Sequence, residues 1–475
     1  MTHETAKPLK TFHHHLSAPV DTAFLTFFRI VYGMTMLVYV WDLISRPRLG
    51  IKDLYIDPVF HFTWQGLEWI QPWPGAGMYI HFVVMLGLSV FVTLGFYYRI
   101  AAPLLCGCFG YVFLLEQTVY QNHYYLLLLI SLLMAFLPAH RAFSVDIIRS
   151  PEIRSSMVPA WALWILRFQI GIPYFYGGLA KLNADWMHGL PMRALLKDKS
   201  AYPLIGPYVD QDWMVALFTW GSTAFDLLVV PLLLWRFTRK PAFLMAVAFH
   251  LTNAALFRIG IFPWLMIAGT TVFFSPNWPR SLWRSRRRNV FPAQQGLPLG
   301  WISSLRRKSA VAVLVLYVGI QLLMPFRHLM YPGNVDWTEE GTRFAWRMML
   351  RGKFVRLVFY ATHTNTGETT TVDTKPYLAD YQTVRMLDPD MVLQFSQFLC
   401  RELTDSPDDQ VEIRAVMLVS LNGRKPQLLI DPKTDLAAEH RSLFPKPWVL
   451  PLSEPLRDDP WTVPVHQWDM PSLDL

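Results

Sequence analysis

Long apolar stretches separated by short polar ones run from residue 22 to about residue 326 of this 475-residue chain. Several approach the roughly 20 residues that an α-helix needs to cross the hydrocarbon core of a bilayer. The nine candidate spans are residues 22–44, 78–97, 100–117, 122–138, 160–181, 212–235, 241–258, 261–275 and 309–326. The seventh and eighth are short enough to form one re-entrant pair instead. The pattern predicts a membrane α-helical bundle of about nine transmembrane helices.

The pattern changes after the last span, where polar residues and turn signals dominate. Residues 354–360 alternate like a β-strand, and residues 369–374 can pair back on them. Residues 388–400 have the pattern of a capped amphipathic helix, with Pro389 at its first position. A second hairpin is predicted over residues 410–430, with its turn at Asn422-Gly423. The order hairpin, helix, hairpin predicts an α+β domain.

Composition and charge set the topology. Hydrophobic residues make up 53% of the chain and charged residues 16%, whereas a soluble chain carries about 25% charged residues. Lysine and arginine concentrate in the loops that are cytoplasmic if the N-terminus is inside, which predicts an extracytoplasmic C-terminus in the cell's inner or plasma membrane. This bias explains the net charge of +8 without nucleic-acid binding. The predicted parts are a cytoplasmic segment, the transmembrane domain and the extracytoplasmic α+β domain, at residues 1–21, 22–329 and 330–475.

One face of the fifth predicted span carries charge at membrane depth. Helical steps of four and three residues from its arginine select Arg167, Gly171, Tyr174, Gly178 and Lys181. Charged groups in a membrane are costly and usually face a protein interior or a wet cavity. Glycine on the same face allows close approach of a helix or a flat ligand. Alternatively, Lys181 extends to the headgroups, and Arg167 is an ion-pair partner of Asp226 or a clamp for backbone carbonyls.

Two histidines lie where they can join Lys181. His123 opens the fourth span near the outer surface, and His250 shares a face of the seventh span with Asn253. Lys181, His123 and His250 can therefore converge on one pocket, in which a desolvated, neutral amine removes a phenolic proton and neutral histidines stabilise the anion. Each histidine is equally open to a purely structural interpretation. Histidines with the spacing H-x-x-x-H are absent from the spans, so no metal site is predicted.

A cationic and aromatic segment follows the last span. Its arginines recur at every fourth position, at Arg343, Arg347 and Arg351, with Trp337 and Trp346 nearby. Such a surface can receive an acidic peptide. The alternative is a juxtamembrane helix with an aromatic belt and an ion pair between Glu339 and Arg343.

Five short motifs occur in the same chain in this order: Asn122-His-Tyr-Tyr-Leu126, Ala180-Lys-Leu-Asn-Ala-Asp-Trp186, Phe249-His-Leu-Thr-Asn253, Trp337-Thr-Glu-Glu-Gly341 and Ser420-Leu-Asn-Gly-Arg424. Together they resemble the vitamin K-dependent gamma-glutamyl carboxylase family, in its bacterial form with the horizontally transferred transmembrane domain. The resemblance extends from about residue 20 to residue 440. Animal members have two consecutive lysines in the second motif, and here the first of them is Ala180.

The resemblance implies an activity. In this activity, reduced vitamin K, as phylloquinol or menaquinol, is deprotonated and attacked by O2. The oxygenated intermediate is a strong base and becomes the epoxide. That base removes a γ-proton from a glutamate of a peptide or protein, and the carbanion captures CO2, without a metal. The resemblance implies Lys181 as the catalytic base, assisted by His123 and His250.

Binding residues are expected in the same motifs and on the same helix faces. Membrane lipids are expected to surround the helical domain. We expect the hydroquinone to contact Asn122, Tyr124, Arg167, Tyr174, Gly178 and Asn253. We expect the glutamate substrate to contact Trp337, Arg343, Trp346, Arg347 and Arg351. Two alternatives stay open: a quinol oxygenase that forms the epoxide without peptide carboxylation, and a non-enzymatic quinone- or lipid-binding membrane protein.

Overall fold

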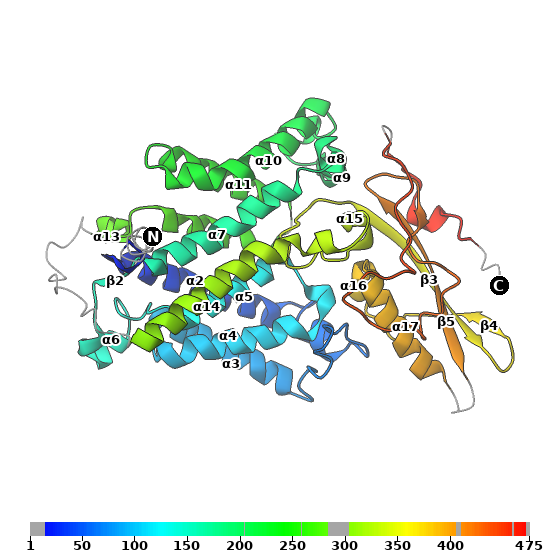
Figure 1. The fold of residues 1–475 in the computed structure, drawn as a ribbon, viewed down its shortest axis with the longest axis horizontal. Coiled ribbons are helices and arrows are strands. Elements are labelled where there is room, and N and C mark those ends of the chain that lie inside the picture. The colour runs from blue at the N-terminus through cyan, green and yellow to red at the C-terminus, as the bar shows by residue number, and fades with distance from the viewer. Residues whose placement is uncertain are drawn as a thin grey trace, which may run out of the picture.

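The structure, a computed structural model, describes residues 15–203, 205–257, 259–283, 304–404, 410–457 and 460–471. Most of the predicted N-terminal segment, residues 1–14, lies outside the described residues. A helical domain occupies one end of the molecule and an α+β domain the other, and α14 (Ser304–Leu323) runs along the first domain toward the second (Figure 1).

Every predicted span overlaps a helix of the structure. These helices are α2 (Ala23–Ser45), α3 (Gly77–Leu94), α4 (Tyr98–Leu115), α5 (Asn122–Phe136), α7 (Trp161–Ala180), α10 (Asp212–Leu234), α11 (Arg239–Leu256), α12 (Phe262–Thr270) and α14. Within the described residues, five segments are long and apolar enough to cross a membrane, namely Ala23–Ser45, Gly77–Leu94, Tyr98–Leu115, Asp212–Leu234 and Ser309–Met330. A helical membrane domain is thus confirmed, and the number of nine crossings stays a prediction.

Short elements connect these helices. They are β1 (Pro19–Asp21), β2 (Met157–Pro159), α6 (Asp146–Arg149), α8 (Ala184–Met187), α9 (Leu190–Leu196), α13 (Trp278–Trp283) and α15 (Val335–Thr338). Close helix packing depends on small residues: a Cβ on Gly33 of α2 would lie 2.3 Å from the hydroxyl of Thr93 on α3. Gly95 ends α3 in the left-handed region, with φ of 66°, which glycine adopts without strain.

The α+β domain is built on one antiparallel sheet with the order β4 (Thr369–Thr371), β3 (Lys353–His363), β5 (Val411–Leu421) and β6 (Gln427–Leu428). β3 and β5 pair over their whole length, from Lys353 opposite Leu421 to His363 opposite Val411. Both predicted hairpins, β3 with β4 and β5 with β6, are present.

Two helices accompany the sheet, α16 (Asp380–Arg385) and α17 (Pro389–Leu403). α17 starts as predicted, because the Asp388 side chain accepts a hydrogen bond from the Asp390 amide and Pro389 holds the first position. Its apolar face packs in the domain core through Phe395 and Leu399.

Buried polar contacts join the two domains. Arg424, beyond β5, donates to both carboxylate oxygens of Asp185 in α8 at 2.6 and 2.8 Å, and the Asn422 amide donates to one of them at 2.7 Å. Glu116, after α4, accepts a hydrogen bond of 3.0 Å from Gln382 in α16. These contacts hold the α+β domain over the end of the bundle near Lys181.

Candidate functional site

A cavity of about 640 Å³ lies where the helical domain meets the α+β domain. α5, α7, α10, α11 and α12 line its inner part, and residues from the 339–351 segment, α16 and the start of α17 line its outer part. Ligand pockets of proteins measure about 300–1,000 Å³ and are mostly apolar with a few converging polar groups. The cavity therefore has room for a bicyclic quinol.

Lys181 lies at the C-terminal end of α7, is 7% exposed and lines the cavity, so it does not extend to the headgroups. Its Nζ atom lies 2.7 Å from a carboxylate oxygen of Asp226 on α10 and 5.2 Å from the centre of the Trp186 ring. The prediction of Asp226 as counter-ion of Arg167 is wrong, because α10 packs beside the C-terminal half of α7. Arg167 instead donates to the carbonyl groups of Val272, at 2.9 Å, and of two following residues, which fits the predicted backbone clamp.

His250 is 1% exposed, lines the cavity and belongs to a directed chain of hydrogen bonds. Its Nε2 atom lies 2.6 Å from the Tyr174 hydroxyl, which lies 3.2 Å from the Thr270 hydroxyl. Thr270 in turn donates to the carbonyl oxygen of Met266 at 2.6 Å, and a carbonyl can only accept. Thr270 therefore accepts from Tyr174, and Tyr174 accepts from His250.

This chain fixes the tautomer of His250. A proton on Nε2 leaves Nδ1 as a bare acceptor, and Nδ1 is buried without a hydrogen-bond partner among the described residues. A buried, unpaired polar atom is costly unless a ligand satisfies it. The imidazole thus lines the cavity with an unpaired acceptor atom that is shielded from solvent, and a ligand hydroxyl reaches this atom once the ring turns toward the cavity.

His123 also lines the cavity, from the start of α5. Its ring lies 5.9 Å from the ring of Phe262, and the ring of His250 lies 6.0 Å from the same phenyl group. Lys181, His123 and His250 thus line one cavity, as the spacing of polar residues predicted.

The residues expected to contact the hydroquinone divide into two groups. Asn122, Tyr174 and Asn253 line the cavity. Tyr124, Arg167 and Gly178 are not among the cavity-lining residues that the structure describes. A Cβ on Gly178 would lie 2.8 Å from Leu227, so this glycine serves the contact of α7 with α10 rather than a ligand.

The expected substrate segment lines the outer part of the cavity but is not a helix. α15 ends at Thr338, and Glu339, Phe344, Trp346 and Met349 all have positive φ, between 55° and 66°. Non-glycine residues in this region cost of order 1–3 kcal/mol each and cluster at functional sites. The alternative of a juxtamembrane helix is therefore wrong, since tight turns carry these residues.

Each arginine of that segment has a carboxylate partner. Arg343 pairs with Asp388 at 2.9 Å, Arg347 with Asp336 at 2.6 Å, and Arg351 with Glu339 at 2.5 Å. The expected Glu339–Arg343 pair is replaced by these contacts. All three arginines line the cavity, but internal acids offset much of their charge.

The two tryptophans of the segment are structural. Trp337 is fully buried and donates to the carbonyl oxygen of Leu450 at 2.7 Å. Trp346 packs against Tyr125 with ring centres 5.0 Å apart. Neither lines the described part of the cavity wall.

Arg385 of α16 is a cavity-lining residue that the sequence did not single out. It donates to the carbonyl oxygen of Thr118 at 3.0 Å, and among the described residues it has no carboxylate within ion-pair distance. No sequence signal marks it, because Arg385 lies more than thirty residues beyond the last arginine of that segment. A cation facing the cavity beside three neutralised arginines can bind an incoming carboxylate.

Comparisons with known proteins agree with this arrangement. A family model described as the HTTM domain matches residues 17–278, more than half of the chain. A second, described as the vitamin K-dependent gamma-carboxylase lumenal domain, matches residues 306–455. No solved structure matches the chain. The first match covers the helices that supply Lys181 and both histidines, and the second covers most of α14 and the α+β domain with the arginines. The chain belongs to the vitamin K-dependent gamma-carboxylase family.

Proposed function

We propose that this integral membrane protein couples the oxygenation of a reduced vitamin K, yielding its epoxide, to the carboxylation of glutamate in a peptide or protein. The observation that supports it most is that one cavity collects Lys181 and His250 from the membrane helices and Arg385 from the outer domain. A buried Nδ1 atom without a partner and a volume of about 640 Å³ fit a quinol with hydroxyl groups. When bound, the quinol supplies the reducing electrons and, after reaction with O2, the strong base.

Lys181 takes the proton of one quinol hydroxyl in this proposal. In the resting ion pair Nζ already carries a proton, so it first passes this proton to the Asp226 carboxylate, and the neutral amine then takes the quinol proton. The Trp186 ring covers the ammonium form and keeps water from it. Nδ1 of His250 accepts the hydrogen bond of the other hydroxyl and orients the ring, with His123 beside it. Asn122, Tyr174 and Asn253 complete the hydroquinone site.

The glutamate side chain approaches from the outer end. Arg385 is the group that we propose to bind the carboxylate, with Arg343, Arg347 and Arg351 around it. These three arginines are already paired with carboxylates of the same chain, which leaves them less able to bind a substrate glutamate. This observation favours the second candidate function, epoxide formation without peptide carboxylation.

We extend the proposal to topology, with all nine helices crossing the membrane, a cytoplasmic N-terminus and the α+β domain outside. The lysine and arginine bias of the loops supports it. Thr366, in the exposed β3–β4 turn, offers a position at which to test on which side of the membrane the α+β domain lies. A membrane-impermeant thiol reagent should label T366C in intact cells, and labelling only after lysis would reverse the orientation.

Replacing Lys181 by alanine should lower epoxide formation by about 10²–10⁴-fold, the usual effect of a general base. Purified protein in lipid is given reduced vitamin K, O2, labelled bicarbonate and a glutamate-rich peptide, and epoxide and peptide-bound label are measured together. K197A, at an exposed lysine of a nearby turn, is the matched control and should keep full activity. Epoxide without label in the unaltered protein would favour the second candidate, and no epoxide with vitamin K or menaquinol would favour a binding protein.

Replacing Thr270 by valine should lower epoxide formation by about fivefold, because the loss of one hydrogen bond costs about 1 kcal/mol. Without the Thr270 acceptor, the Tyr174 hydroxyl turns to donate to Nε2, and Nδ1 of His250 becomes a donor. ¹⁵N NMR of labelled histidine, with the His250 signal assigned from H250Q, should show this change of tautomer. T270S keeps the hydroxyl and should behave as the unaltered protein. A tautomer that is the same in T270V would contradict the hydrogen-bond chain.

A further inference from the structure

A short loop of the α+β domain, residues 441–446, presents two large apolar side chains to its surroundings. Leu443 is 64% exposed and Phe444 is 76% exposed. Apolar side chains of this size are normally turned inward unless a partner covers them.

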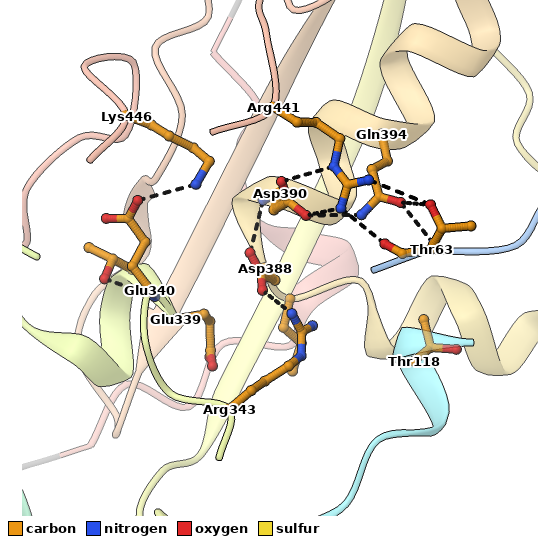
Figure 2. A network of polar contacts seen from close by, with 12 residues as sticks. Thr63, Thr118, Glu339, Glu340, Arg343, Asp388, Asp390, Gln394, Arg441 and Lys446 are labelled. Atoms are coloured by element: carbon orange, nitrogen blue, oxygen red, sulfur yellow. Dashed lines mark hydrogen bonds and ion pairs between the residues drawn. The ribbon is translucent and has the colours of Figure 1, made fainter. Parts of the chain in front are cut away.

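The loop is held in place by ion pairs at both ends (Figure 2). At its start, Arg441 pairs with Asp390 and with Glu68, each at 3.0 Å. At its end, Lys446 pairs with Glu340 at 3.3 Å. The side chains of Arg441 and Lys446 are only 12% and 8% exposed. The charges therefore point inward, and the tip of the loop is left apolar.

A hydrogen bond holds this tip beside the end of a candidate membrane span. The Tyr331 hydroxyl donates to the carbonyl oxygen of Leu443 at 2.6 Å. Tyr331 directly follows the candidate membrane span Ser309–Met330, in which Leu329 is 71% exposed and Met330 is 75% exposed. The tip thus lies beside the end of a candidate span whose apolar side chains are exposed.

A third segment reaches the same loop from the other side. The Gln65 amide donates to the carbonyl oxygen of Arg441 at 3.2 Å. Four residues later Trp69 is 76% exposed, and α3, another candidate span, begins at Gly77. Tryptophan is enriched at the interface between membrane and water. Leu329, Met330, Leu443, Phe444 and Trp69, here called the interfacial patch, thus come from three segments joined by hydrogen bonds.

We propose that the interfacial patch inserts into the outer leaflet of the bilayer and anchors the α+β domain directly in lipid. Lipid is the occupant because the patch continues the surface of two membrane spans and carries no charged side chain. The Ser442 hydroxyl accepts a hydrogen bond from the Phe444 amide at 3.0 Å, and Pro445 lacks an amide donor, so the tip of the loop offers a peptide partner few polar groups. The anchor does not depend on the enzymatic activity.

Nitroxide labelling of F444C tests the proposal with the full chain in phosphatidylcholine nanodiscs. The label should be more accessible to oxygen, which partitions into lipid, than to a water-soluble nickel chelate. T366C, in the turn at the far end of the sheet, should show the reverse (Figure 1). The unaltered chain, labelled in parallel, gives the background from Cys106, Cys108 and Cys400.

Two results would overturn the anchor. Chelate access at F444C equal to that at T366C would mean that the patch faces water. Protection from both oxygen and chelate would mean that protein covers it, as in a second copy of the chain or another partner. If F444C fails to fold, L443C provides the same measurement at the neighbouring exposed position.

Discussion

Replacement of Asp226 by asparagine is expected to destabilise the protein by about 3–5 kcal/mol and to remove most of its epoxide formation. The reason is that Asp226 is the ion-pair partner of Lys181 at 2.7 Å, with both side chains less than 10% exposed. Removal of one partner leaves a charge buried and unpaired, which costs far more than the pair contributes to stability. The proposed proton path from Nζ is lost at the same time.

Thermal unfolding and epoxide formation should be measured on the same preparations. D212N is the matched control on the same helix, because Asp212 is 91% exposed and its loss should change neither quantity. The double variant K181M/D226N removes both charges and should regain much of the stability without regaining activity. Full activity in D226N would show that Lys181 needs no carboxylate partner.

Replacement of Arg424 by alanine should separate the two domains. Arg424 holds Asp185 through two hydrogen bonds, and both side chains are at most 10% exposed. Loss of this buried contact should cost about 3–5 kcal/mol. We expect a lower unfolding temperature, faster proteolysis between the domains and reduced epoxide formation, since Asp185 lies four residues after Lys181. R414A, which breaks a partly exposed pair on β5, should cost at most about 1 kcal/mol.

The same contact has a pH signature. Burial alone would raise the pKa of Asp185, but hydrogen bonds from Arg424 and Asn422 and the guanidinium charge outweigh it and hold the pKa below its ordinary value of 3.8. The contact therefore stabilises the folded state above pH 3.8 and loses this contribution as the pH falls through the lower folded-state pKa. R424A should lack this acid-dependent part of the unfolding free energy. A dependence of the unfolding free energy on pH that is the same in R424A as in the unaltered protein would contradict this role of the contact.

The sequence predicted the parts of this protein better than their contacts. The length of the apolar stretches predicted nine spans, each of which overlaps a helix, and turn signals predicted both hairpins. These predictions succeed because the patterns are local. The pairing of β3 with β5 joins strands almost fifty residues apart, and no local pattern specifies it.

Within the site, spacing on one helix placed Lys181 at the cavity but did not identify Asp226 as its ion-pair partner. The contact between Lys181 and Asp226 depends on how α7 and α10 pack, which their sequences do not specify. In the same way, the four-residue spacing of Arg343, Arg347 and Arg351 indicated a helix, whereas carboxylates of α15, its C-cap and the N-cap of α17 hold these arginines in tight turns. Arg385 could be found only from the folded chain.

The paired arginines at the outer end of the cavity also set a threshold for any acidic ligand. Asp336, Glu339 and Asp388 belong to the same chain, so each is present at its guanidinium group at an effective concentration of order millimolar or above. An isolated glutamate must compete with these built-in carboxylates and should occupy the arginines only weakly. A segment with several closely spaced glutamates can displace them together, which makes the density of acidic residues, rather than any one of them, the property selected at this entrance.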